Sequence, residues 1–153
     1  MSNRLDKKGL ILWRTFLTAY AAAIGHIDAE LSQAGLIPLE WYDVLLALEE
    51  AEGQKLRMNE LAQSVLLSRS GLTRLVDRIE KAGLLRREAC PTDRRGAYAV
   101  LTKEGQAARE RTWPAYSQGI AEHFARHFTV EEAAVLTNAL GRVVSESSRS
   151  SPA

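Results

Sequence analysis

Apolar residues recur at alternating steps of three and four through the first part of the chain, from Leu10 to Leu31. This spacing places them on one face of a helix, which we predict over about residues 7–33. A helix of more than 25 residues is difficult to cover in a chain of 153 residues. We therefore expect part of it to pack against a second copy of the chain, the alternative being an ordinary core helix.

Shorter elements follow this helix. Gly35 and Pro38 interrupt it, and the next apolar stripe predicts a helix over roughly residues 39–51. The pattern then predicts one short strand at residues 55–58 and a brief helix at residues 59–64.

The most informative pattern is a helix predicted over residues 69–82, with Ser68 as its N-cap and Gly83 as the residue that ends it. The turn before it contains Leu66, which we expect to pack into the core. The predicted apolar face carries Leu72, Val76, Ile79 and Ala82, and the polar face carries Arg69, Ser70, Thr73, Arg74, Asp77, Arg78 and Lys81.

Two β-compatible runs between residues 84 and 101 surround a cluster of turn-forming residues that includes Arg94 and Arg95. Two helices joined by a short turn, the second of them basic, and then a hairpin form the pattern of a winged helix-turn-helix. For Asp77 and Glu80 the simpler interpretation is pairing on the helix surface with Arg74, Arg78 or Lys81.

The C-terminal third is predicted to be helical. Thr102 caps a helix over residues 103–127, in which Pro114 should cause a kink or a division. Residues 129–132 have the spacing of a capping box before a last helix. The serine-rich end from Ser145 is predicted to be uncompact, with residues 147–153 as a disordered tail.

Charge is segregated along the chain. Residues 55–104 hold 11 Lys and Arg against 6 Asp and Glu, whereas residues 1–54 hold 4 against 8 and residues 105–153 hold 5 of each. A basic middle region favours a DNA-contacting module, because attraction to phosphate depends on the local face rather than on the net charge of +1.

The sequence contains one cysteine, so an internal disulfide is excluded. We find no recognisable signal peptide and no uninterrupted apolar run of about 18 residues, and no motif for a catalytic nucleophile or acid–base pair. We therefore expect a soluble cytoplasmic, nucleoid-associated protein that is not an enzyme, has no cofactor and does not bind a membrane.

The basic helix suits the major groove of double-stranded DNA. Its first turn would bring Arg69, Ser70, Thr73 and Arg74 to base edges, and Arg78 and Lys81 would meet the phosphate backbone. Arg94 and Arg95 could enter the minor groove. The alternative is a solvated basic face.

The order and spacing of several short motifs over residues 10–144 resemble the MarR family of bacterial transcription regulators. These motifs are Leu61-Ala62, Thr73-Arg74-Leu75, Glu80-Lys81-Ala82-Gly83-Leu84, Asp93-x-Arg95 and Leu101-Thr102. The resemblance implies a homodimer that binds a pseudo-palindromic operator, usually as a repressor, and is released by a small, often phenolic, effector or an oxidant. It also implies that Arg95 enters the minor groove and that Asp93 orients it.

The predicted fold class is mainly α (α+β), a winged helix-turn-helix with long N- and C-terminal dimerisation helices. We expect a single domain over residues 1–153. The dimerisation helices would lie at residues 7–34 and 103–146, and the DNA-binding part at residues 39–102.

The resemblance also implies an effector pocket, and five residues whose rings and cation would suit an aromatic acid or phenol are candidates for it, namely Trp13, His26, Trp41, Tyr42 and Arg86. Trp and Tyr at helical spacing are equally consistent with core or interface positions. His123 and His127 have a spacing that can bind metal, but no cysteine or carboxylate cluster accompanies them, so we predict no metal site. Cys90, next to the predicted hairpin tip, is a candidate for oxidant sensing.

Two classes of function remain open. The first is a ligand-responsive DNA-binding regulator, with redox- or metal-responsive variants of the same family. The second is a winged-helix module whose basic face binds an acidic protein. The salt dependence of DNA binding separates them, because contacts to phosphate make affinity fall steeply with salt.

Overall fold

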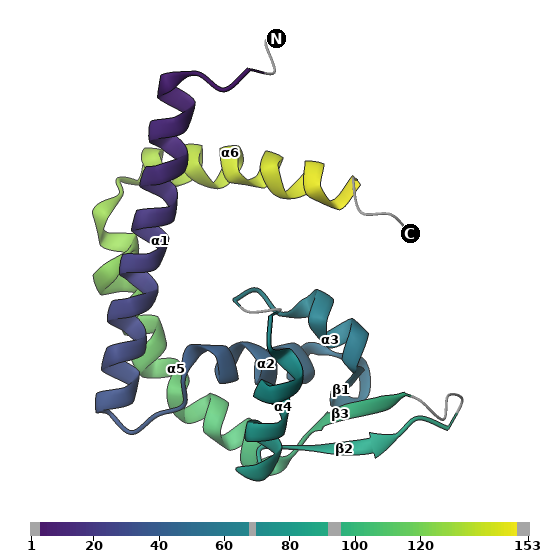
Figure 1. Ribbon diagram of the computed structural model, residues 1–153. Coiled ribbons are helices and arrows are strands. Elements are labelled where there is room, and N and C mark those ends of the chain that lie inside the picture. The colour runs from purple at the N-terminus through teal and green to yellow at the C-terminus, as the bar shows by residue number, and fades with distance from the viewer. Residues whose placement is uncertain (1–3, 68–69, 92–95, 150–153) are drawn as a thin grey trace. The chain divides into compact units, whose positions relative to one another are not determined.

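The computed structural model describes residues 4–67, 70–91 and 96–149 (Figure 1). Its elements are α1 (Lys7–Gln33), α2 (Leu39–Glu50), η1 (Glu52–Gln54), β1 (Lys55–Arg57), α3 (Met58–Ser64), α4 (Leu72–Lys81), β2 (Leu85–Ala89), β3 (Ala97–Leu101), α5 (Lys103–His123), η2 (Ala125–His127) and α6 (Val130–Arg149). They form two compact units. One is residues 28–117, called here the winged unit, and the other is residues 1–27 with 118–153, called here the helical unit.

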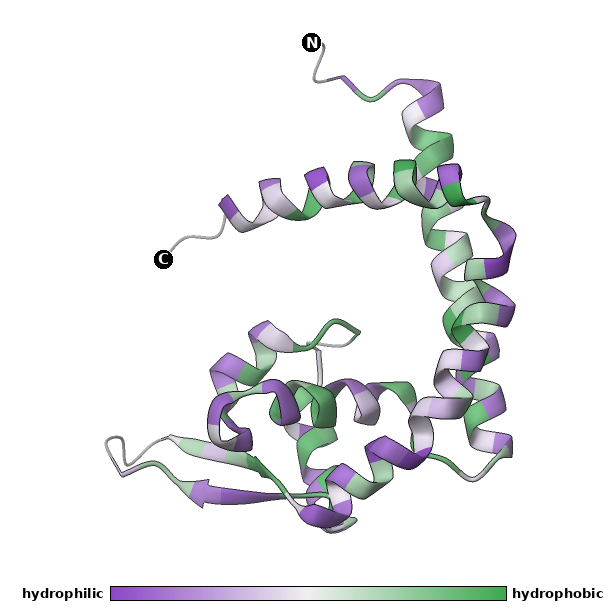
Figure 2. Cartoon of the chain, turned by 180° about the vertical axis from the view of Figure 1, so that it is seen from behind, coloured by the Kyte–Doolittle hydropathy of each residue, from purple (hydrophilic) through white to green (hydrophobic). Residues whose placement is uncertain are grey.

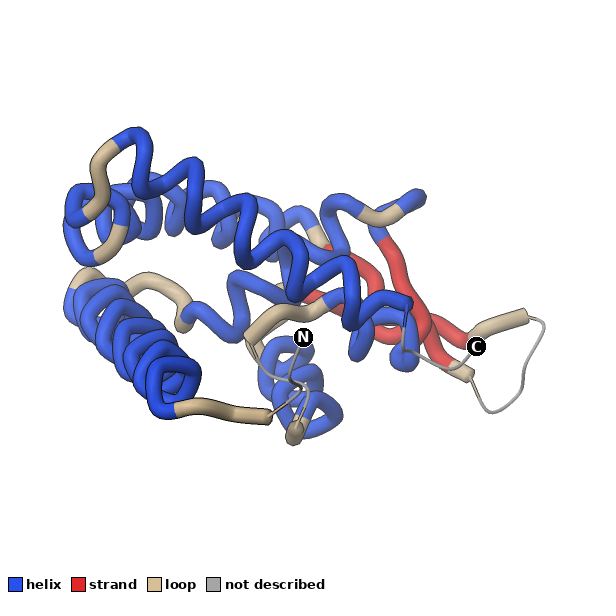
Figure 3. Tube along the Cα trace, turned by 90° about the horizontal axis from the view of Figure 1, so that it is seen from above, coloured by secondary structure: helices blue, strands red, loops and turns tan. Residues whose placement is uncertain are grey.

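The winged unit contains a three-stranded antiparallel sheet in the order β1-β3-β2, drawn red in Figure 3. Side chains from α2, α3, α4 and the sheet form one core, in which Val44, Leu45, Leu48, Leu61, Val76 and Ile79 are fully enclosed. The predicted mainly α winged helix-turn-helix is therefore confirmed, as are the two N-terminal helices and the short first strand.

The junction between the sheet and α5 depends on a glycine and a cap. A Cβ at Gly105 would overlap the carbonyl oxygen of Leu84, so only glycine fits there. The Thr102 hydroxyl accepts a hydrogen bond from the Gly105 N–H at 3.0 Å and donates one to the Gly83 carbonyl at 2.7 Å. Gly83 has φ +78°, as expected for the residue that ends α4. The predicted roles of Thr102 and Gly83 are confirmed.

A half-buried ion pair ties α2 to α5 within the winged unit. The Arg109 guanidinium lies against the Glu49 carboxylate, with Nη2 donating to Oε1 at 3.2 Å, and its Nη1 donates to the Tyr42 hydroxyl at 3.3 Å. Burial acts to lower the pKa of Arg109, but the hydrogen bond to Tyr42 and the attraction of Glu49 outweigh it and raise that pKa. The guanidinium is therefore charged at any pH at which the protein folds.

Two core predictions around α4 are wrong. Leu66 is 88% exposed, and Val65, at 1%, fills the core below the turn instead. Ala82 is exposed while Leu75 is buried, because α4 ends at Lys81 and its buried face is set by the helical period from Leu72.

The C-terminal helices differ from prediction in two places. Helix α5 ends at His123 rather than at residue 127, and it is not divided at Pro114. Helix α6 continues through Arg149. The uncompact end predicted from Ser145 and the disordered tail predicted from residue 147 are therefore wrong as far as residue 149. Residues 150–153 lie outside the described part. The hydroxyls of Ser145, Ser147 and Ser148 donate to carbonyls four residues earlier, so these donors are satisfied within the helix.

The start of α6 agrees with the predicted capping box. The Glu132 N–H donates to the Thr129 hydroxyl at 3.1 Å, and the Thr129 N–H donates to the Glu132 carboxylate at 2.9 Å. The pair satisfies two backbone donors at the helix start.

The helical unit leaves extensive apolar surface uncovered, visible as green segments along α1 and α6 in Figure 2. One close contact in this unit is between Ile27 of α1 and Gly119 of α5. A Cβ at position 119 would lie only 3.0 Å from a side-chain carbon of Ile27. None of the described residues of α6 is buried. The exposed apolar residues of these two helices are Leu10, Ile11, Leu12, Trp13, Phe16, Leu17, Tyr20, Val130, Val135, Leu136, Leu140, Val143 and Val144.

By length and composition α1 is long and apolar enough to cross a membrane. Core helices of soluble proteins meet the same criterion, so it does not assign α1 to a membrane.

Candidate nucleic-acid interface

Helix α4 begins at Leu72, not at Arg69 as predicted. The residue before it, Gly71, has φ +71°, a left-handed conformation that a continuous right-handed helix cannot contain. Ser70 therefore lies in the turn and not on the helix face. The predicted N-cap Ser68 and the predicted base contact Arg69 lie outside the described residues.

The two faces of α4 differ as the sequence predicted. Leu72, Leu75, Val76 and Ile79 are buried against the core. Four polar residues of the predicted set are exposed on the opposite face, namely Thr73, Arg74, Arg78 and Lys81. Thr73 and Arg74 lie in the first turn, the part of a recognition helix that reaches base edges in a helix-turn-helix.

The acidic residues of α4 pair with a residue of the sheet. The predicted pairing of Asp77 and Glu80 with basic residues of their own helix is therefore wrong. Arg87 of β2 lies 2.7 Å from the Asp77 carboxylate and 3.3 Å from that of Glu80. The Arg87 backbone N–H also donates to Glu80, at 3.0 Å. No pattern in the sequence indicated Arg87, because its partners are seven and ten positions away on another element.

This pairing determines the charge that α4 presents. Asp77 and Glu80 are compensated by Arg87, whereas Arg74, Arg78 and Lys81 form no ion pair with any described residue. Three exposed cations on one helical face attract a polyanion, and long flexible basic side chains reach several phosphates.

The hairpin that follows pairs Leu85 with Leu101 at its base and Ala89 with Ala97 toward its tip. The Cys90 N–H donates to the Gly96 carbonyl at 3.2 Å, and Cys90 is only 5% exposed. Asp93, Arg94 and Arg95, the residues predicted to enter the minor groove, lie outside the described residues.

The sheet carries a second group of cations, near Tyr98 and Glu88, which are paired across β2 and β3. Lys55 Nζ lies 4.8 Å and the Arg57 guanidinium 5.8 Å from the centre of the Tyr98 ring. A hydrogen bond to Tyr98 raises the pKa of Arg57. Lys55 and Arg86 both approach Glu88, at 3.8 and 3.0 Å.

The five predicted effector-binding residues are divided between the two units. In the winged unit, Tyr42 is 4% exposed and contacts the rings of Trp113 and Tyr116, Trp41 packs against the core, and Arg86 pairs with Glu88. In the helical unit, Trp13 is exposed beside Phe16, and His26 lines a cavity. The lining of that cavity includes none of the other four.

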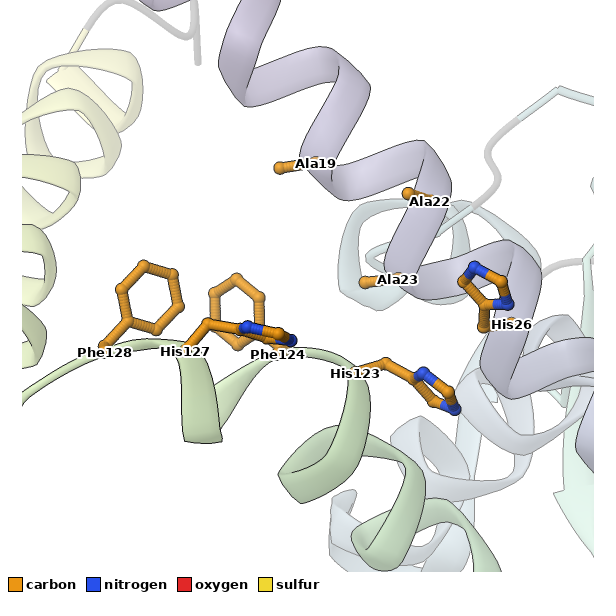
Figure 4. Close-up of a pocket in the computed structure, with 8 residues that line it drawn as sticks. All are labelled: Ala19, Ala22, Ala23, His26, His123, Phe124, His127 and Phe128. Carbon is orange, nitrogen blue, oxygen red and sulfur yellow. The ribbon is translucent and has the colours of Figure 1, made fainter.

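The cavity with His26 lies between α1 and the end of α5 and has a volume of about 210 Å³ (Figure 4). The His26 and His123 rings stack with 5.0 Å between their centres. The described residues contain no group of three or more His, Cys, Asp or Glu side chains that could hold a metal ion. The cavity is lined by Ala19, Ala22, Ala23, His26, His123, Phe124, His127 and Phe128.

The arrangement of a basic helix against a small sheet has close parallels in known proteins. The sequence model of the MarR family matches residues 31–96. The transcriptional regulator MhqR of Bacillus subtilis is 30% identical over 139 residues, which cover 91% of this chain and 93% of MhqR. The chain belongs to the MarR family. It is a DNA-binding transcription regulator and not an enzyme, as the sequence predicted.

Solved structures agree with this MarR assignment. The MarR family regulator Sco3205 from Streptomyces coelicolor, solved in complex with DNA, is 33% identical, with a TM-score of 0.81 over 95% of this chain and 91% of that one. AbsC from the same organism is 30% identical, with a TM-score of 0.80 over 95% and 97% of the two chains. A repressor of a homoprotocatechuate degradative operon from Escherichia coli is 30% identical over 124 residues, 81% of each chain.

Proposed function

We propose that this MarR protein is a cytoplasmic, homodimeric repressor that binds a pseudo-palindromic operator and is released by a small aromatic acid or phenol. The observation that carries the proposal is the exposed basic face of α4, on which Arg74, Arg78 and Lys81 have no ion-pair partner among the described residues while Arg87 compensates Asp77 and Glu80. An uncompensated basic face beside a buried apolar one is what a helix in the major groove requires.

Within this complex, Thr73 and Arg74 would meet base edges, and the contacts predicted for Ser68, Arg69 and Ser70 remain part of the proposal. Arg78 and Lys81 would meet phosphates. The predicted minor-groove contact of Arg95, with Asp93 and Arg94 beside it, remains part of the proposal. Arginine bound to guanine through two hydrogen bonds contributes about 1–3 kcal/mol of discrimination against another base.

The homodimer is supported by the apolar surfaces of α1 and α6. Trp13, Phe16 and Leu17 of α1 and Leu136 and Leu140 of α6 are all exposed, and so much large apolar surface is unusual for a monomer. Helices 7–34 and 103–146 would bury these faces against a second copy, as two-fold symmetric oligomers do. The distance between the two α4 helices would then be near one turn of duplex, about 34–36 Å.

Repression is supported by one relative, the repressor of the homoprotocatechuate degradative operon, and the compound in its name suggests the class of effector. Homoprotocatechuate is itself a phenolic acid. That Trp13, His26, Trp41, Tyr42 and Arg86 take part in binding such a molecule remains a prediction from the sequence.

DNA binding is tested by titrating a fluorescent duplex, selected from a randomised library, against wild type and two variants. Arg74→Ala should weaken binding about tenfold or more and relax sequence preference, since it removes a base contact. Arg95→Ala should weaken binding through loss of the minor-groove contact. Equal affinity of both variants and wild type would refute the proposed readout. Weak salt dependence with no preference over random DNA would favour a protein-interaction module instead.

Release by an effector is tested with a panel of aromatic carboxylates and phenols. A true effector raises the Tm of the protein and lowers its affinity for the duplex, because it stabilises the form that binds DNA poorly. A panel that changes neither quantity would refute the effector part of the proposal and leave the DNA-binding part standing.

A further inference from the structure

We propose that Asp43 is a positioning residue for sequence recognition, because its carboxylate fixes the turn between α3 and the recognition helix α4. Asp43 lies in α2, more than twenty positions from this turn. Its Oδ2 accepts hydrogen bonds from the backbone N–H groups of Leu66, at 2.7 Å, and of Leu67, at 2.9 Å. The proposal rests on the proposed base readout by α4.

Side-chain burial fixes the residue directly after α3 but not the next one, Leu66. Val65, directly after α3, is buried and donates its N–H to the Leu61 carbonyl at 3.1 Å. Leu66 is 88% exposed, so burial of its side chain does not hold the backbone in place. Its N–H and that of Leu67 point to Asp43 instead, and bonds from N–H to a carboxylate are among the stronger ones in proteins.

The helix that carries Asp43, α2, is itself fixed by buried side chains and by hydrogen bonds near both ends. Leu45 and Leu48 of α2 are fully buried in the core of the winged unit. The first N–H of α2, that of Leu39, donates to the Asp28 carboxylate at 3.0 Å, and Glu49 near the other end is bound by Arg109. Asp43 therefore holds the backbone of Leu66 and Leu67 at a fixed position relative to α2.

Recognition should depend on this link more than general attraction to DNA does. Hydrogen bonds to base edges require a fixed orientation of α4, whereas attraction to phosphate depends mainly on the number of cations, which a change at Asp43 leaves intact. Loss of the carboxylate should therefore reduce affinity for a specific duplex and change affinity for random DNA little.

The experiment compares Asp43→Ala with Asp43→Asn. Both turn hydrogen bonds go to one oxygen, and the carbonyl oxygen of asparagine has two lone pairs, so Asp43→Asn can keep both. Asp43→Ala should bind the selected duplex on the order of tenfold more weakly than wild type, with a change below about twofold for random DNA. Asp43→Asn should bind both duplexes nearly as wild type does.

Glu50→Ala is the matched control, since it removes one carboxylate from an exposed position of the same helix. It should behave as wild type on both duplexes. Amide hydrogen exchange supplies a second readout. In Asp43→Ala the Leu66 and Leu67 amides should exchange about tenfold faster than in wild type, and the amides of the buried face of α4 should not.

Several results would overturn the proposal. The first is that Asp43→Ala discriminates between the selected and the random duplex as well as wild type does. The second is that Asp43→Asn and Asp43→Ala lose the same affinity for the selected duplex, because the charge and not the hydrogen bonds would then be responsible. If Asp43→Ala does not fold, rapid exchange of both amides in the wild type would equally refute it. A wild type without preference for any duplex would refute the proposed readout, whereas the amide exchange would still test the contact.

Discussion

The two units of this chain use apolar residues in opposite ways. The winged unit buries its leucines and valines among themselves, with six of the largest fully enclosed. In the helical unit, α6 has no buried residue and α1 exposes Trp13, Phe16 and Leu17. The same residue types therefore stabilise the single chain in one unit and lie exposed on it in the other, where the proposed dimer would cover them.

Folding stability and self-association should therefore depend on different parts of the chain. The stability of the winged unit depends on its own packing, whereas the apolar faces of α1 and α6 are stabilising only once a partner covers them. Substitutions of equal size in the two units should accordingly alter different measured quantities.

The largest effect is expected in the core of the winged unit. Leu45→Ala should lower the free energy of unfolding by about 2–5 kcal/mol, because a fully buried leucine leaves a cavity. The same change at the 88% exposed Leu66 should cost less than about 0.5 kcal/mol. Urea unfolding followed by circular dichroism measures both, and similar values would contradict the assignment of the core.

A charge in the apolar face of α6 should act on association. Leu140→Asp should weaken the homodimer on the order of a hundredfold, since an unpaired carboxylate would have to be buried in the interface. Asn138→Asp adds the same charge to the opposite side of α6 and should leave the dimer intact. Sedimentation equilibrium measures the dissociation constant, and an unchanged value for Leu140→Asp would exclude this face from the interface.

The start of α6 offers a smaller and more local test. Thr129→Ala removes the hydroxyl that accepts the Glu132 N–H and should cost about 1 kcal/mol of stability. Thr129→Ser keeps the hydroxyl and should cost much less. Thermal unfolding of the two variants measures the difference, and an equal loss in both would mean that the methyl group, not the cap, matters.

The smallest effect on stability is expected from Arg87→Ala. The ion pairs of Arg87 with Asp77 and Glu80 are about one-third or more exposed, so their loss should cost no more than about 1 kcal/mol. Operator affinity should nevertheless fall several-fold, because two carboxylates on α4 become uncompensated. Arg126→Ala breaks an exposed pair with Glu122 in the helical unit and is the control. Equal affinities would show that Arg87 has no electrostatic role in binding.

Periodic patterns predicted most of the fold. The helix seam from Leu10 to Leu31, the basic helix ended by Gly83 and the capping box at Thr129 are all local signals, and each has its counterpart in the structure. The exposed basic face of α4 was likewise predictable, because alternation of apolar and polar positions fixes which side is buried.

What the sequence did not predict depends on contacts between distant elements or on competing local conformations. The partner of Asp77 and Glu80 is on a strand, and no spacing along a helix indicates it. Gly71 could have continued the helix or broken it, and its positive φ decided the start of α4. The serine-rich end suggested disorder by composition, yet it is helical through Arg149, with its hydroxyl groups bonded to carbonyls of the preceding turn.

All three histidines of the chain, His26, His123 and His127, lie in the helical unit and line one cavity. The Hε1 protons of the imidazole rings give resolved magnetic resonance signals in a spectral region with few others, so three peaks, one from each histidine, would report on this unit alone. A titration with DNA or with an aromatic acid could then be followed through signals of the helical unit without isotopic labelling of single sites. Any movement of those peaks on operator binding would be a direct record of communication between the two units.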